Sequence, residues 1–412
     1  MKSRFFIMNL LGVFILSISS WQCEDNPIEA DLSHLSLSVN TLSIDSISVS
    51  SYWVAPNLGS NERLYLGTKN GLKVPVSFIE IKTPSPNYWN YYSDSTITID
   101  SLHFKLYTNS LKEALLPNLY FKSGFHFDES KSTYLDFVGY SIVDWESIGQ
   151  PNVIVNTDTS GIFTYTELVW DIMSIIDNLT FSKNNNNNTP LISKGEGTFA
   201  IYNPQIDYFE AFSEEATTGE KDPKVIIYYR RSVIIGDSTT IDTTSATIYS
   251  SGDLSIIKPN VMSLDSTKLG LSNGIGLRSL VSISFDSASI PKGSLIRKAL
   301  LSLPIDTLAS SDGYNIIVDP IDELVDTADV VFETDPYIGM GYPYPYRASS
   351  DIENGMFTIS LKSFLQNITL GNETNLGFKV VANEKNDPFE SINFDIENES
   401  AKPILEIIYV AN

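Results

Sequence analysis

Two aromatic-rich segments contain the residues of this sequence best suited to binding a ligand. Flat sugar faces stack on aromatic rings, and neighbouring polar groups bind the hydroxyls. The first segment is rich in Pro, Asn and Ser, and the second is broken by Pro and Gly. Their rings are Tyr88, Trp89, Tyr91 and Tyr92 in the first, and Tyr337, Tyr342, Tyr344 and Tyr346 in the second. Both clusters are candidate glycan-binding sites; the alternative is that the rings pack long loops onto a core or join two domains.

Residue patterns typical of catalysis are few. The phosphate-binding P-loop and His-Glu-x-x-His are absent from the sequence. Ser255 and Lys258 match Ser-x-x-Lys, but its companion motifs are missing, so we attribute the match to chance. Among 50 acidic residues no carboxylate pair can be singled out. The sequence therefore predicts a protein that is not an enzyme, and a hydrolase or lyase on a β-sandwich is the less favoured alternative.

Metal-binding patterns are also weak. His34, His103 and His126 are far apart and lack the spacing of metal ligands. Loops such as 310–313 contain Ser and Asp, whose oxygen atoms suit calcium, but no twelve-residue calcium loop is present. We predict no metal site and no cofactor, and the sequence leaves a structural calcium open.

Cys23, the only cysteine, closes an N-terminal segment with the features of a secretion signal. A positively charged start precedes residues 5–18, which are almost entirely apolar. This stretch is shorter than the roughly 20 residues of a stable spanning helix. A single Cys after such a stretch resembles the acceptor of a bacterial lipoprotein signal, so residues 1–22 are predicted to be a signal peptide and Cys23 the lipidated residue. Gln22 departs from the small residue usual at that place, and the alternative is an ordinary signal whose removal leaves a free thiol.

Residues 23–36 are predicted to be the lipidated cysteine and a polar, acidic tether. Glu24 and Asp25 directly follow the cysteine, and this resembles the surface-export signal of some Bacteroidetes lipoproteins. The expected location is the outer membrane or the cell surface, with the inner leaflet of the outer membrane as the alternative to surface display.

Charge restricts the partners. The formal net charge of the 412-residue chain is -23. Such a surface repels phosphate backbones, so no nucleic-acid partner is expected. It also resists anionic membrane surfaces, and this favours anchoring by the lipid alone. Polysaccharide or another envelope protein are the partners that remain.

Short β-branched and aromatic runs, separated by Gly, Asn, Asp and Pro, dominate the sequence after residue 37. Val281 and Ile283 alternate with serines at the period of a half-buried strand. The runs 225–229 and 405–410 are apolar and β-branched. Together these patterns predict an all-β chain of antiparallel β-sandwiches.

Three short helices are expected within this β-rich chain, and two tryptophans are expected in its cores. The helices are predicted over Leu111–Leu116, Glu167–Asn178 and Leu361–Gln366. The core tryptophans are predicted to be Trp145 and Trp170.

An internal repeat divides the chain. Three pairs of segments match in the same order: 66–71 with 269–274, 99–106 with 296–303, and 223–229 with 403–409. A period near 200 residues indicates two tandem domains. We predict a first β-sandwich over residues 37–231 and a second over residues 232–412.

The repeated segments resemble a DNRLRE-type domain, a secreted β-sandwich module of bacterial and archaeal surface proteins. The second copy carries Arg278 to Asp286, the turn Ile290-Pro291-Lys292-Gly293, the run Ile296 to Leu303 and the closing strand Pro403 to Tyr409. The first copy carries an opening Asn57 to Gly67 and then departs from the pattern. The resemblance implies two tandem jelly-roll-like sandwiches with a role in binding or display, and carbohydrate-binding relatives add polysaccharide capture. Arg278 is expected to be structural.

The sequence thus favours a non-enzymatic, lipid-anchored cell-envelope protein whose sandwiches act as a binding or interaction module. The alternative is a carbohydrate-binding lipoprotein that takes part in polysaccharide capture.

Overall fold

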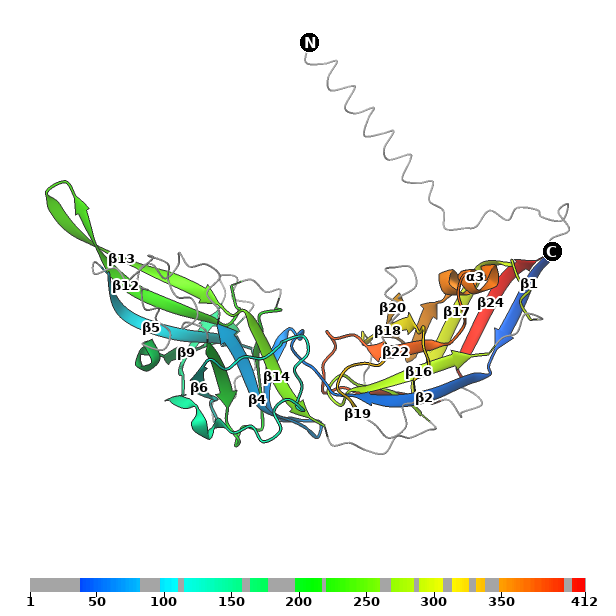
Figure 1. Cartoon of the computed structure of the whole chain (residues 1–412), viewed down its shortest axis with the longest axis horizontal. Helices are drawn as coiled ribbons and strands as arrows, with labels where there is room; N and C mark the ends of the chain where they lie inside the picture. The colour runs from blue at the N-terminus through cyan, green and yellow to red at the C-terminus, as the bar shows by residue number, and fades with distance from the viewer. Residues whose placement is uncertain are drawn as a thin grey trace, which may run out of the picture.

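The fold is nearly all β. A computed structural model describes residues 38–81, 97–109, 115–157, 164–176, 197–216, 220–259, 268–284, 289–306, 313–325, 331–337, 348–395 and 402–411. Its strands form two β-sandwiches at opposite ends of an elongated molecule (Figure 1). The predicted all-β sandwich architecture is therefore confirmed. The signal peptide, Cys23 and the tether lie outside the described residues.

The first sandwich consists of two facing sheets. In one, the strand order is β11 (Tyr208–Phe212), β3 (Arg63–Lys69), β4 (Leu72–Ile81), β10 (Gly197–Tyr202), β6 (Asn118–Ser123) and β7 (Glu146–Gly149), and β14 (Gly252–Lys258) also pairs with β4. In the other, the order is β13 (Ser238–Tyr249), β12 (Lys224–Ile235), β5 (Ile97–Thr108), β9 (Thr164–Asp171) and β8 (Asn152–Thr157). Two 3₁₀ turns, η3 (Ile142–Asp144) and η4 (Met173–Ile175), accompany them.

The second sandwich is a longer run of paired strands that folds back on itself. Its order is β1 (Ser38–Ile44), β24 (Ile404–Ala411), β17 (Leu295–Pro304), β21 (Met356–Ser360), β20 (Ala348–Glu353), β18 (Asn315–Pro320), β22 (Phe378–Ala382), β16 (Leu277–Ile283), β2 (Ile47–Val54) and β19 (Val331–Phe332). A small sheet of β15 (Lys268–Leu271) and β23 (Ile392–Asp395) and the helix α3 (Lys362–Leu370) complete it.

The two N-terminal strands belong to the second sandwich, although they precede the first in the chain. β1 pairs antiparallel with β24, so that Ser38 lies opposite Ala411. β2 pairs antiparallel with β16, so that Ile47 lies opposite Ile283. The predicted division into residues 37–231 and 232–412 is thus corrected by the strand pairing. Residues 38–54 join the second sandwich, and the boundary at residue 231 falls inside β12, a central strand of the first.

Equivalent strands of the two sandwiches pair in the same way. The repeated segments 99–106 and 223–229 lie in β5 and β12, which pair antiparallel, and their counterparts lie in β17 and β24, which do the same. β13 and β14 occupy in the first sandwich the places that β1 and β2 occupy in the second. The first sandwich is therefore completed by the strands that directly follow its repeated segments, and the second by strands from the N-terminal part of the chain.

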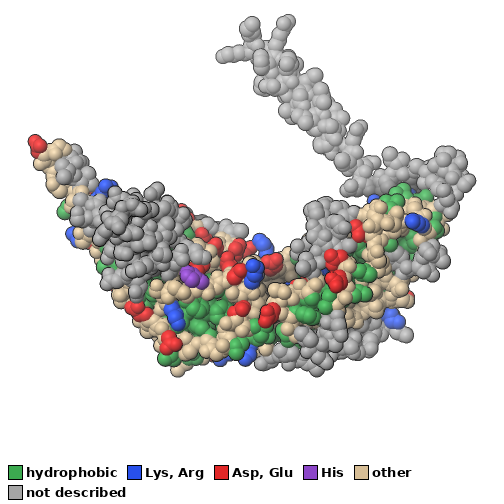
Figure 2. Space-filling model, in the orientation of Figure 1, with side chains coloured by type: hydrophobic (Ala, Val, Ile, Leu, Met, Phe, Trp, Pro, Cys, Tyr) green, Lys and Arg blue, Asp and Glu red, His purple; other side chains and the backbone are tan. Residues whose placement is uncertain are grey.

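A loop of the second sandwich, residues 383–390, inserts into the first. Phe389 is 3% exposed, and its ring packs edge-on against Tyr65 at a centroid distance of 5.1 Å. Lys69 forms an ion pair with Asp387 at 2.5 Å, and the Asn70 side-chain amide donates to the Phe389 carbonyl. Charged side chains of both signs gather at this junction (Figure 2). The two sandwiches therefore share a buried contact as well as two chain crossings.

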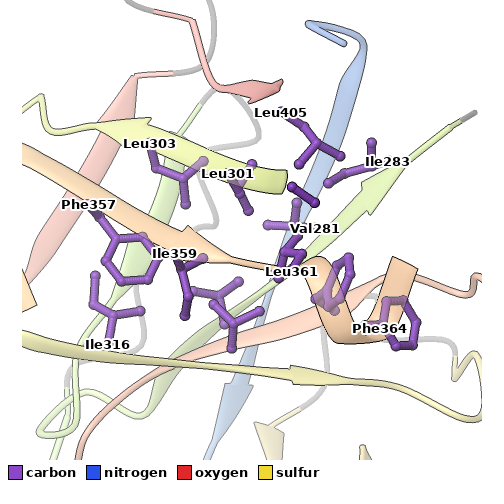
Figure 3. Packing of buried hydrophobic residues seen from close by; sticks show 14 of the residues in the cluster. Val281, Ile283, Leu301, Leu303, Ile316, Phe357, Ile359, Leu361, Phe364 and Leu405 are labelled. Atoms are coloured by element: carbon purple, nitrogen blue, oxygen red, sulfur yellow. The ribbon is translucent and has the colours of Figure 1, made fainter. Parts of the chain in front are cut away.

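Alternation along the strands places the apolar side chains between the layers. In the second sandwich, Leu301 and Leu405 from one layer meet Val281 and Ile316 from the other (Figure 3). Phe364, on α3, closes one side of this core. Burying each such side chain contributes roughly 1.5 to 3 kcal/mol.

Local predictions had mixed outcomes. The helix expected over Leu361–Gln366 is confirmed as α3, whereas the one over Glu167–Asn178 is wrong. Residues 164–171 are instead strand β9, held between β5 and β8, and within the described residues the short turn η4 follows it. Most of Leu111–Leu116 lies outside the described residues. Trp145 and Trp170 are buried, at 6% and 1% exposure, as predicted.

Candidate functional site

Most of the predicted glycan-binding rings cannot be placed. Tyr88, Trp89, Tyr91, Tyr92, Tyr342, Tyr344 and Tyr346 lie outside the described residues. Tyr337 is described and is only 2% exposed. Its hydroxyl donates to the Val325 carbonyl at 2.8 Å, and its ring packs edge-on against Tyr52. Tyr337 is thus a packing residue of the second sandwich.

Asp335 is the polar centre of the same region. Its carboxylate accepts hydrogen bonds from the Arg278 guanidinium, the Lys379 ammonium group and the Tyr52 hydroxyl. Burial, followed by the nearby Asp335 charge, raises the pKa of Tyr52 far above its ordinary range. Arg278 therefore has the structural role expected for it, because it pairs with an acid.

A different segment, residues 124–145, forms the best candidate site and is called the 124–145 loop below. It covers the outer face of the β4 sheet, where Phe78 is completely buried. Five aromatic rings of the loop surround Phe78: Phe125, Phe127, Phe137, Tyr140 and Trp145. The alternation of β4 explains the arrangement, because Phe78 and Glu80 point outward to the loop while Ile79 and Ile81 point into the core.

The loop lines a pocket of about 450 Å³ that is open to solvent. Its apolar walls are the partly buried rings of Phe125, Phe137 and Tyr140, with Val138 at the rim, 80% exposed. Its other lining residues are His126, Ser132, Asp136 and Gly139. Aromatic walls with a few polar side chains are typical of sites that bind small polar molecules.

Two polar groups of the residues lining this pocket differ in their access to solvent: the His126 ring is half-exposed and the Tyr140 hydroxyl is buried. His126 Nδ1 lies 2.6 Å from Oε1 of Glu80, a carboxylate whose side chain is only 3% exposed, and this contact orients the ring. The Tyr140 hydroxyl is buried and has no hydrogen-bond partner in the structure. Burial raises its pKa, so the hydroxyl stays neutral and able to donate.

A set of carboxylates lies beside the loop. Glu129, in the loop, accepts a hydrogen bond from the Asp253 backbone N–H at 2.6 Å. Asp253, itself 1% exposed, accepts from the Glu214 backbone N–H at 2.6 Å. Burial raises the pKa of Asp253 well above its ordinary value, and burial with the neighbouring Glu129 charge raises that of Glu214 to about 7. These acids therefore hold protons at pH values where surface carboxyls are ionised.

Other features of the described residues carry less chemistry. They contain no group of three His, Cys, Asp or Glu side chains placed to hold a metal ion. No helix among them is long and apolar enough to cross a membrane. A second hollow of about 320 Å³ lies between the turn that follows β10 and the adjacent parts of β3 and β4, and its lining is mixed polar and apolar.

Comparison with protein-family models, with curated proteins and with solved structures returned no match. The resemblance to a DNRLRE-type domain therefore stays a prediction, and the site has to be interpreted from its own geometry.

Sequence reasoning missed the 124–145 loop, although a signal was present. Aromatic residues recur every two to seven positions from Phe125 to Trp145, among Gly, Ser and Asp. Such a segment is too polar for a core strand and too aromatic for an ordinary surface loop. The pairing of His126 with Glu80, 46 residues earlier in the chain, left no sequence signal.

Replacing Tyr140 by Phe tests whether the buried hydroxyl contributes to the stability of the fold. Since the substitution removes a buried group without a partner, we expect the free energy of unfolding to stay equal or to rise by about 1 kcal/mol. Denaturant titration of the two proteins measures this. A loss of more than about 1 kcal/mol would show that the hydroxyl stabilises the fold.

Replacing Glu214 by Gln tests the carboxylate set. The raised pKa of Glu214 means that ionisation favours the unfolded chain, so wild-type stability falls as pH rises from 4.5 to about 7 and is constant above that. Gln cannot ionise, so the free energy of unfolding of the variant should rise relative to that of the wild type across this pH window. The expected gain is on the order of 1 kcal/mol once solvent screening is included. Denaturant titrations at pH 4.5 and pH 8 measure the difference. An unchanged difference between the two pH values would contradict the shifted pKa.

Proposed function

We propose that this chain is a non-enzymatic, lipid-anchored protein of the cell envelope that binds a ligand in the pocket of the 124–145 loop. The N-terminal pattern that ends at Cys23 supports the anchor and a location at the outer membrane or cell surface. The sandwiches then act as a scaffold that positions the loop. Nucleic acid is not among the partners, because the net charge of -23 repels phosphates.

One observation carries the proposal. The pocket combines three aromatic walls with the oriented His126 ring and the unpartnered Tyr140 hydroxyl. A loop that only covered a sheet would gain stability from pairing that hydroxyl or replacing it with an apolar group. An oriented, half-exposed His126 ring beside aromatic side chains favours recognition of a ligand.

Carbohydrate is the ligand class that this pocket favours. Sugar rings present an apolar face to aromatic side chains and hydroxyls to polar ones, and the pocket offers Phe125, Phe137 and Tyr140 beside His126 and Asp136. The acidic surroundings select against anionic ligands, so a neutral saccharide fits better than an acidic one. Polysaccharide capture is therefore the specific function proposed for the site, and binding of another envelope protein is the alternative.

A matched pair of substitutions tests the pocket. Val138 at its rim and Val143 elsewhere on the loop are 80% and 83% exposed, so neither side chain contributes to packing. In the soluble residues 24–412, Val138→Arg should obstruct the pocket while Val143→Arg should not. We expect glycan-array binding by the wild type and by Val143→Arg, with at least a tenfold loss of affinity for Val138→Arg.

Two results would count against this function. Equal binding by both Arg variants would place the ligand elsewhere, for instance at the aromatic segments outside the described residues. No glycan binding by folded wild type would favour the protein-partner alternative, which a pull-down from envelope extracts with the same two variants then tests.

A further inference from the structure

We propose that the end of the second sandwich formed by β1, β17 and the end of α3 rests on the surface of the lipid bilayer. This membrane-facing end, as we call it below, comprises Val39, Lys292, Leu295, Arg297 and Leu370. The inference rests on the proposed lipid anchor at Cys23 and adds a second, protein-mediated contact with the same membrane.

The path of the chain selects this end. β1 begins at Ser38, opposite Ala411 near the C-terminus. Only the 14 residues 24–37 separate Ser38 from Cys23, and at full extension they span at most about 50 Å. Because β1 belongs to the second sandwich, an anchor at Cys23 holds that sandwich next to the membrane. The first sandwich lies at the opposite end of the molecule (Figure 1).

Exposed apolar side chains gather at the same end. Val39 on β1 lies opposite Val410 on β24, which in turn lies opposite Leu295 on β17, so the three form a row across neighbouring strands. Val39 is 54% exposed and Leu295 58%. Leu370, the last residue of α3, is 50% exposed. The backbone hydrogen bond from Gly293 to Thr369 brings that helix end beside the start of β17.

Basic residues accompany this apolar row in a strongly acidic chain. Gly371 ends α3 with φ of 78°, and the Lys292 side chain lies against it, as the favourable field at a helix C-terminus predicts. Arg297 follows Leu295 by two residues, while Lys298 is neutralised by Glu406 at 3.0 Å. Hydrophobic and basic side chains are visible at this end in Figure 2.

Apolar side chains flanked by Lys and Arg suit the headgroup boundary of an anionic bilayer, where chains insert by about 5 to 10 Å. The net charge of -23 predicted that the lipid alone would hold the protein at the membrane. We infer instead that the local composition of this end adds a direct contact with the bilayer. It also directs the 124–145 loop away from the bilayer, toward ligands in solution.

Fluorescent labels on single cysteines test the contact. In the lipidated protein the sulfur of Cys23 is blocked, so a cysteine introduced by Leu295→Cys or Leu370→Cys is the only free thiol. Val143→Cys, on the first sandwich and 83% exposed, is the matched control. The labelled proteins are bound to phosphatidylethanolamine–phosphatidylglycerol vesicles that contain spin-labelled lipid. We expect quenching at positions 295 and 370 to exceed that at position 143 by at least about threefold, because the quencher acts only near the headgroup boundary.

The outcomes separate the contact from the anchor. Vesicle-bound protein with equal quenching at all three positions would overturn the contact and leave the anchor intact. Protein that does not float with the vesicles would overturn both. In the unlipidated 24–412 chain, the label at position 295 could become more shielded from solvent as the protein concentration rises. That result would assign this surface to contact with a second copy and would overturn the lipid contact.

Discussion

The pairing of β1 with β24 and of β2 with β16 is the constraint on which the rest of the structure depends. An unpaired strand exposes a row of backbone N–H and C=O groups, and β1 and β2 satisfy those of β24 and β16. The second sandwich receives this pair from the N-terminus, and the first receives β13 and β14 from the middle of the chain. The chain therefore crosses between the sandwiches twice, and the buried Phe389 contact lies at these crossings. The first sandwich, β3 to β14, is thus a continuous segment inserted between β2 and β15 of the second.

Long-range strand pairing within the first sandwich also builds the candidate site. β14 pairs with β4, and this brings Asp253 to Glu129 of the 124–145 loop. β4 supports that loop with Phe78 and Glu80 on its outer face, and its inner face belongs to the core. The pocket is consequently held by long-range strand pairing, although its walls come from one continuous segment. An anchor at Cys23 would then place this pocket at the far end of the molecule from the membrane.

Strand character, the Asn70–Gly71 turn and the helix α3 were predictable because each follows from local composition. Asn70 and Gly71 have φ of 50° and 79°, the left-handed values that a tight hairpin requires. The pairing of β1 with the second sandwich was not predictable from sequence. Its alternation pattern would fit either sandwich, and only the geometry of the neighbouring strands determines which one it joins. The helix expected over 167–178 failed because pairing with β5 and β8 overrides weak local preference. Tyr337 illustrates the same limit: an aromatic loop residue looks alike in sequence whether buried or exposed.

The most direct test of this account is a disulfide between β1 and β24. Thr41 lies opposite Ile408 in the register, at a separation that a disulfide spans in antiparallel strands. In a Cys23→Ser background, Thr41→Cys with Ile408→Cys should oxidise to a single intramolecular disulfide, seen by mass spectrometry of the monomer. Free thiols after oxidation would mean that β1 does not pair with β24, and a disulfide found only in dimers would place β1 in a second copy. Either result would contradict the pairing of β1 with β24, on which the proposed orientation at the membrane and the corrected domain division rest.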